Sequence, residues 1–200
     1  MKVVVPEEYK YLYVTDEDHP IVKIPDEVLV TKAAEVERVT KRHQVLADNM
    51  VRIMRAARGI GLAAPQIGVG ERVIVINPNN RPIVIFNPRI TERSGTQVGE
   101  EGCLSIPGLY GDVERSLNVV VEGLDRKGRE STWDMDGLAA RIVQHEIDHL
   151  DGVLILDRAP RPQRKGALRA LREGESYSPP LSDQEADVGD GEHREPRSNA

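Results

Sequence analysis

Two histidines and a glutamate stand close together in residues 144–149, which read QHEIDH. His145 and His149 are four residues apart, so on a helix their side chains lie on the same face. Two imidazoles in that arrangement can bind one metal ion, and Glu146 between them stays free to transfer protons. The chain has only five histidines in 200 residues, so a chance pairing around a glutamate is the weaker explanation. The segment therefore predicts a catalytic metal site on a helix.

A catalytic metal site commonly has three protein ligands and one open position, and the sequence offers three sources for the third ligand. A long protease motif would place a histidine at position 155, where Ile155 stands. A downstream glutamate, Glu173 or Glu175, lies in a segment poor in apolar residues, where a ligand is hard to hold rigidly. The third source is Cys103, the only cysteine of the chain. A thiolate with two imidazoles suits a borderline divalent ion.

A helix must carry the motif if its two histidines are to share one face. Asp136 is a good N-cap residue and Gly152 a suitable stop, so we expect this helix to run from near Asp136 through His149. Its inner face would carry Leu138, Ile142, His145 and His149.

The other expected elements follow from the spacing of apolar residues. Apolar residues recur at intervals of three and four over residues 32–58, which predicts an N-terminal helix. The basic residues 160–172 could form another helix. Short apolar runs bounded by turn residues predict strands, two within 72–87 and one each over 117–124, 129–133 and 153–157.

Strands therefore stand before and after the helices, without the alternation of strand and helix that marks a parallel sheet. This order predicts an α+β fold in which antiparallel β-sheets pack around a central helix carrying the HExxH motif. An N-terminal helix and a C-terminal basic segment complete the expected architecture. Residues 1–20 are polar with a few tyrosines and predict only an edge strand or an arm.

The net charge of −6 is concentrated at the C-terminus. Residues 173–200 hold eight acids and two arginines, whereas residues 1–172 hold equal numbers of acids and bases. The C-terminal segment is also rich in Gly, Pro and Ser. We therefore expect one domain over residues 1–172 and a disordered acidic tail over residues 173–200.

The composition also bears on the compartment of the protein. A single cysteine excludes an intrachain disulfide. No apolar run approaches the roughly 18 residues of a membrane span, and the first residues lack the apolar stretch of a signal peptide. We therefore expect a cytoplasmic protein without a membrane or DNA partner.

Residues 59–66 read GIGLAAPQ, which fits the G-x-G-x-x-A pattern of a dinucleotide-binding loop. That loop needs a strand before it and a helix after it. Here a helix is expected before it, and Pro65 would interrupt a following helix. The glycines are better explained by a close approach of the backbone to a ligand.

Three blocks occur in a fixed order: GIGLAAPQ at 59–66, EGCLS at 101–105 and QHEIDH at 144–149. Together they resemble the three motifs of the peptide deformylase family, with similar spacing, and the likeness extends over about residues 20–160. Tyr110 stands where some members carry an arginine. This departure concerns substrate preference in the loop after the cysteine and not the chemistry.

The resemblance implies removal of the formyl group from the N-terminal formylmethionine of newly made polypeptides. Cys103, His145 and His149 would hold one divalent ion, Fe²⁺ in the cell, with Ni²⁺, Co²⁺ or Zn²⁺ able to replace it. A water bound to this ion would attack the formyl carbonyl, with Glu146 as general acid and base. The side-chain amide of Gln66 and the backbone N–H of Leu104 would then join Glu146 in catalysis by stabilising the oxyanion.

By the same resemblance, the peptide would lie extended against the backbone of Ile60, Gly61 and Gly102, like an added strand. The methionine side chain would enter an apolar pocket. Its lining would be Ile60, Leu138, Ile142 and the aliphatic stem of Arg141.

Two other functions remain open at the level of the sequence. One is a zinc endopeptidase of the HExxH type. The other is a structural metal site in a binding protein, which would need a fourth ligand, and no second cysteine exists.

Residues 158–172 hold six basic residues and no acid. They form either a solvated surface or a contact with the ribosome through RNA phosphates. The adjacent acidic tail would compete for the same cations.

Overall fold

The structure is a computed structural model, and it describes residues 20–180. In chain order its elements are η2 (Glu27–Val30), α1 (Lys41–Ala56), β1 (Gly61–Ala63), η3 (Ala64–Ile67), β2 (Val73–Ile76), β3 (Ile83–Ser94), β4 (Gln97–Cys103), β5 (Ile106–Arg115), β6 (Asn118–Leu124), β7 (Glu130–Asp136), α2 (Gly137–Leu150), α3 (Ile155–Arg158) and α4 (Arg161–Glu173).

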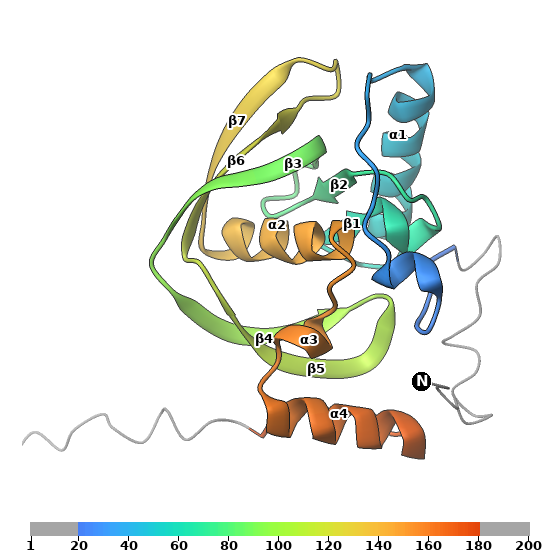
Figure 1. Cartoon of the computed structure of the whole chain (residues 1–200), viewed down its shortest axis with the longest axis vertical. Coiled ribbons are helices and arrows are strands. Elements are labelled where there is room, and N and C mark those ends of the chain that lie inside the picture. The colour runs from blue at the N-terminus through green and yellow to red at the C-terminus, as the bar shows by residue number, and fades with distance from the viewer. Residues whose placement is uncertain (1–19, 181–200) are drawn as a thin grey trace, which may run out of the picture.

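Every strand pairing within the two sheets is antiparallel. Five strands form one sheet in the order β1-β2-β3-β6-β7, and β4 pairs with β5 in a separate two-stranded sheet. Figure 1 shows β3 and β4 as one green band that curves around α2. The predicted α+β class, with antiparallel sheets around a central helix, is confirmed.

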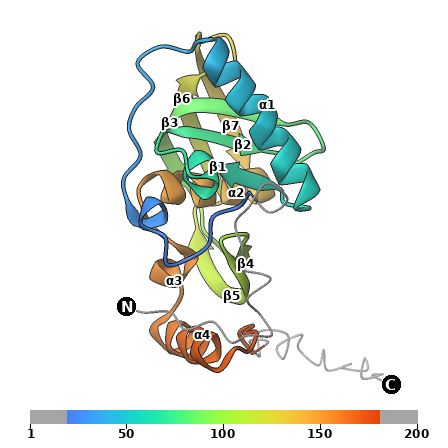
Figure 2. The same cartoon turned by 90° about the vertical axis from the view of Figure 1, so that its right-hand side faces the viewer.

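The five-stranded sheet is covered by a helix on each face. In β2, Val73 and Val75 pack in one apolar cluster with α1, whereas Ile74 and Ile76 pack in another with α2. This burial of both faces explains why β2 reads as an unbroken apolar run. Figure 2 shows α1 lying across the sheet, with α3 and α4 at the opposite end of the molecule.

The helix α2, which carries the histidines, has the bounds that the sequence predicts. It begins after Asp136 and ends at Leu150, two residues before Gly152. Asp136 holds the N-cap position, but its side chain makes no capping hydrogen bond. Burial of nine of its fourteen residues, rather than a cap, is therefore what holds this helix in place.

The N-terminal helix is shorter than predicted, because α1 begins only at Lys41. The residues before Lys41 form hydrogen bonds with residues far along the chain, and they do not form a helix. The Asn87 side chain accepts from the Val36 N–H at 2.8 Å and donates to the Val36 carbonyl at 2.9 Å. Ala34 forms a parallel bridge with Glu71. Tertiary hydrogen bonds here override a helical spacing of apolar residues.

The strand predicted over residues 153–157 is wrong, because residues 155–158 form the short helix α3. The Asp157 carboxylate accepts from the Leu154 N–H at 3.1 Å, which supports a helical turn. A run of four apolar residues fits a buried strand and a buried helical turn equally well. The helix expected over the basic residues 160–172 is present as α4.

The ordered chain extends past the boundary that we expected at residue 172. Glu173 is the last residue of α4, and Tyr177 then returns to β5. Its N–H donates to the Gly108 carbonyl, and its carbonyl accepts from the Tyr110 N–H, both at 2.8 Å. The first part of the expected tail is therefore packed on the domain.

Two further expectations concern the ends of the chain. The edge strand or arm over residues 1–20 lies outside the described residues except for Pro20, and so does the expected tail beyond residue 180. Within residues 20–180, none of the helices is long and apolar enough to cross a bilayer.

Candidate metal centre and active site

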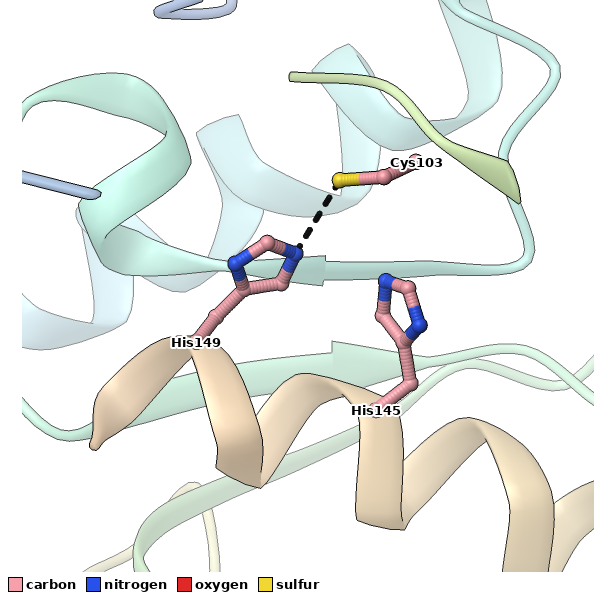
Figure 3. A group of neighbouring side chains, drawn as sticks. All are labelled: Cys103, His145 and His149. Carbon is pink, nitrogen blue, oxygen red and sulfur yellow. Dashed lines mark hydrogen bonds between the residues drawn. The ribbon is translucent and has the colours of Figure 1, made fainter. Parts of the chain in front are cut away.

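Three possible ligand atoms meet where the end of β4 faces α2. The sulfur of Cys103 and a ring nitrogen from each of His145 and His149 lie within 4.8 Å of one another. Cys103 Sγ is 3.2 Å from His149 Nε2. Figure 3 shows both histidines rising from α2 toward the sulfur. One thiolate and two imidazoles form a suitable set for a borderline divalent ion, so the residues fit the metal that the sequence predicts.

The ring of His145 is fixed by a carboxylate on β4. Its Nδ1 lies 2.9 Å from Glu101 Oε2. Burial acts to raise the pKa of Glu101, but hydrogen bonds from His145 and Arg115 outweigh it and lower the pKa to about 2. An ionised Glu101 accepts the Nδ1 proton, which leaves Nε2 as the free donor atom for a metal.

The surroundings of Cys103 favour its thiolate form. Burial opposes ionisation, but His149 and His145 outweigh it and hold the pKa of the thiol well below its usual value. His149 is 1% exposed, and its Nδ1 is buried without a hydrogen-bond partner in the described chain. The two histidines therefore differ, because in the part of the chain that the structure describes only His145 has a carboxylate bonded to its Nδ1.

Glu146 lies beside His145 and between the two histidines along α2, and it is itself buried, at 4% exposure. Burial raises its pKa to about 7, against the lowering effect of both histidines. Its Oε2 accepts no hydrogen bond from any residue in 20–180. A carboxylate with such a pKa and a free oxygen can take a proton from a water and return it near neutral pH.

The side chain of Gln66 reaches the site from η3, with 2% exposure. Its Oε1 accepts from the Ala63 N–H at 2.9 Å, which turns the amide nitrogen toward Cys103 Sγ (3.6 Å) and Ser105 Oγ (3.3 Å). Leu104 follows Cys103 in the turn that joins β4 to β5. The Gln66 amide nitrogen thus lies beside the sulfur, and Leu104 is the residue that follows Cys103 along the chain.

A cleft of about 560 Å³ opens over these residues. Its walls include the edge strand β1 and the outer edge of β4, and neither of these edges has a strand partner among residues 20–180. Tyr110 also lines the cleft and covers Gly102, where a Cβ atom would lie 2.6 Å from Tyr110 Cε1. Of the twelve site residues named from the sequence, eleven line this cleft: Ile60, Gly61, Gln66, Gly102, Cys103, Leu104, Leu138, Arg141, Ile142, His145 and Glu146.

The guanidinium of Arg141 has a role that the sequence did not suggest. It donates to Glu101 Oε1 at 2.7 Å and to the Val113 carbonyl at 3.0 Å, and so ties α2 to the β4–β5 hairpin. Glu101 was also missed as a site residue. The sequence could have indicated Glu101, because it stands two residues before Cys103 and alternate residues of a strand lie on the same face. The alternative ligand Glu173 instead pairs with Arg169.

Comparison with known proteins identifies the family. A family model described as polypeptide deformylase matches residues 18–165. The chain belongs to the polypeptide deformylase family. A peptide deformylase from Desulforudis audaxviator is 49% identical over 141 residues, which are 70% of this chain and 92% of that protein.

Solved deformylase structures also resemble the chain. The structure from Thermus thermophilus has a TM-score of 0.73 and 45% identity, covering 78% of this chain and 93% of that one. A deformylase from Ehrlichia chaffeensis in complex with actinonin has a TM-score of 0.72 and 36% identity, with coverage of 78% and 96%. The family consists of metal-dependent hydrolases that remove a formyl group, so membership favours this activity over an endopeptidase or a structural metal site.

Proposed function

We propose that this deformylase removes the formyl group from the N-terminal formylmethionine of newly made polypeptides, in the cleft above α2. The observation that carries the proposal is the meeting of two groups of residues in one cleft. One group is the ligand set Cys103, His145 and His149. The other is Glu146, a buried carboxylate with one oxygen free.

The ligand set would hold one divalent ion, with His145 oriented by Glu101. Fe²⁺ is the ion that we propose for the cell, with Ni²⁺, Co²⁺ or Zn²⁺ as substitutes, since all four accept nitrogen and sulfur ligands. When bound, the ion supplies Lewis-acid activation of water and of the formyl carbonyl.

Glu146 acts as the general base and then as the general acid. It takes a proton from the attacking water on its free oxygen and delivers that proton to the leaving nitrogen, so that the amine departs neutral. A pKa near 7 before metal binding suits a group that must both accept and donate.

The negative charge that develops on the formyl oxygen is stabilised by Gln66 Nε2 and by the Leu104 N–H. The hydrogen bond between Gln66 Oε1 and the Ala63 N–H keeps the amide from turning over. Because the Gln66 amide is held by this hydrogen bond before the reaction, it needs no reorganisation during it. Loss of one such donor typically costs about 10²–10³-fold in rate.

The substrate peptide would bind as an added strand between the free edges of β1 and β4. Ile60, Gly61 and Gly102 offer backbone at these edges. The methionine side chain would pack against Ile142 and Leu138, and Leu138 is a large apolar residue with 54% exposure at the rim. An apolar side chain of the substrate would cover it.

The basic segment 158–172 supports a contact with ribosomal RNA less strongly than its sequence suggests. Arg158, Arg164 and Arg169 each pair with an acid. That leaves fewer cations for phosphates, so we propose a weak contact through the exposed face of α4. Replacing Arg161 and Lys165 by Glu should lower ribosome co-sedimentation at low salt, and equal pelleting of both proteins would exclude it.

The function is tested by three assays on the metal-loaded full chain. We expect release of formate from formyl-Met-Ala and no cleavage of casein. Formate release from formyl-Met-Ala should also greatly exceed acetate release from acetyl-Met-Ala, since the larger acyl group must fit the same cleft. Casein cleavage without formate release would instead support the endopeptidase.

A further inference from the structure

A row of charges connects the proposed metal ligand His145 to the surface of α3. Glu101 accepts from His145 Nδ1 at 2.9 Å and from two nitrogens of Arg115, Nε at 3.0 Å and Nη2 at 2.9 Å. Arg115 also donates through Nη1 to Asp148 Oδ2. Arg158 then donates to both oxygens of Asp148, at 2.6 and 3.1 Å. Acids and bases therefore alternate from His145 through β4 and β5 back to Asp148 of α2, and from there to α3.

The members of this row differ in their access to water. The side chains of Glu101 and Arg115 are each 5% exposed and that of Asp148 is 11% exposed, whereas that of Arg158 is 49% exposed. Within residues 20–180, Arg158 is the only donor to Asp148 Oδ1. Removing one partner of a buried ion pair is destabilising, and without Arg158 this oxygen would have no donor from residues 20–180, although Arg115 would remain on Oδ2. Asp148 therefore depends on a residue at the surface.

Arg115 is shared by two carboxylates, so its hold on Glu101 depends on how strongly Asp148 attracts it. With Arg158 present, Asp148 has a second cation, and Arg115 keeps two parallel hydrogen bonds to Glu101. Without Arg158, Arg115 would be the only cation on Asp148 and would move toward it. Within residues 20–180, Arg141 would then be the cation left on Glu101, and with one cation instead of two the carboxylate would hold the ring of His145 less firmly.

We propose that Arg158 positions the metal ligand His145, acting through Asp148, Arg115 and Glu101, and so sets how tightly the site holds its ion. The inference rests on the proposed function, in which His145 is a ligand. It gives a role to the first cation of the basic segment 158–172. Replacing a residue that hydrogen-bonds to a metal ligand and orients it typically changes metal affinity by about 10–100-fold. We expect about a tenfold change on replacing Arg158, because it acts on His145 through other residues.

The test compares Arg158→Met with Arg164→Met as a matched control. Both side chains are 49% exposed and both pair with an acid, but the partner of Arg164 is Asp157, which is itself 45% exposed. Each protein is loaded with Zn²⁺, and transfer of the metal to a chelator is followed. We expect about tenfold faster release from Arg158→Met and the parent rate from Arg164→Met. Equal release from the two variants would overturn the proposal.

The route through Asp148 is tested by repeating the Arg158→Met comparison in an Asp148→Asn background. If Arg158 acts through this carboxylate, its replacement should change metal release by less than twofold there. A full tenfold effect in that background would overturn the route. The absorption spectrum of bound Co²⁺ provides a second readout, because a displaced His145 ring should change it in Arg158→Met and not in the control.

A Cys103→Ala variant separates this inference from the proposed function. If that variant holds metal as tightly as the parent, the proposed ligand set itself is wrong. If it loses the metal while Arg158→Met retains it at the parent affinity, only the inference about Arg158 fails.

Discussion

Replacing Gly61 by Ala should disable catalysis by moving Glu146. A Cβ atom at position 61 would lie 2.1 Å from Glu146 Oε1 and 2.8 Å from Ile142 Cγ2. A Cβ atom in ordinary contact lies at least 3.4 Å from a neighbouring heavy atom, so the carboxylate must move by about 1.3 Å to restore such a contact. A misplacement of about 1 Å can cost about 10²-fold in rate, which corresponds to about 2.7 kcal/mol in the activation free energy.

The assay measures kcat for formyl-Met-Ala, together with bound metal and the melting temperature. Gly70→Ala is the control, because no atom lies within 4 Å of a Cβ atom there. We expect Gly61→Ala to keep its metal, to melt lower because the methyl group overpacks the site, and to lose about 10²-fold in kcat. Gly70→Ala should match the parent in all three. A Gly61→Ala variant with metal bound and kcat within threefold of the parent would refute this account of the site.

Three further predictions concern the ligand set, the pH dependence and the C-terminus. Cys103→Ala should leave less than a tenth of the parent's bound metal after dialysis, and full metal content with retained activity would contradict the assignment. Because Glu146 must be ionised to accept a proton, kcat/KM should rise with pH. The pKa of Glu146 is about 7 without metal and should fall beside a cation. A midpoint of the kcat/KM profile above pH 7 would therefore count against this role. Truncation after Pro180 should leave turnover unchanged. Truncation after Glu173 removes the pairing of Tyr177 with β5, so it should raise KM several-fold and lower the melting temperature. Equal behaviour of the two truncated proteins would show that this pairing is dispensable.

The sequence predicts α2 well because its apolar spacing, its N-cap position and its stop signal agree. The same kind of pattern failed over residues 32–40, where Asn87 supplies side-chain partners to the backbone of Val36. These partners lie 51 residues apart in the sequence, so no local pattern indicates them. Residues 153–157 failed for another reason, since a short apolar run does not distinguish a strand from a helical turn.

Most of the site could be predicted because its residues carry chemistry at fixed spacing. Cys103 and His149 were expected together, and their side chains approach to 3.2 Å. Glu101 and Arg115 were missed because buried charges look like surface charges in a sequence. Only the fold reveals that they form an ion pair between β4 and β5, and that Glu101 holds a histidine of α2.

The central claim is that Glu146 transfers protons beside a metal that it does not bind, and Glu146→Gln tests this most directly. The amide keeps the shape of the side chain and removes the base. We predict one divalent ion per chain, as in the parent, and a loss of at least about 10²-fold in formate release from formyl-Met-Ala, in the range of general acid–base catalysis. Turnover within a few-fold of the parent with the metal retained would contradict the account.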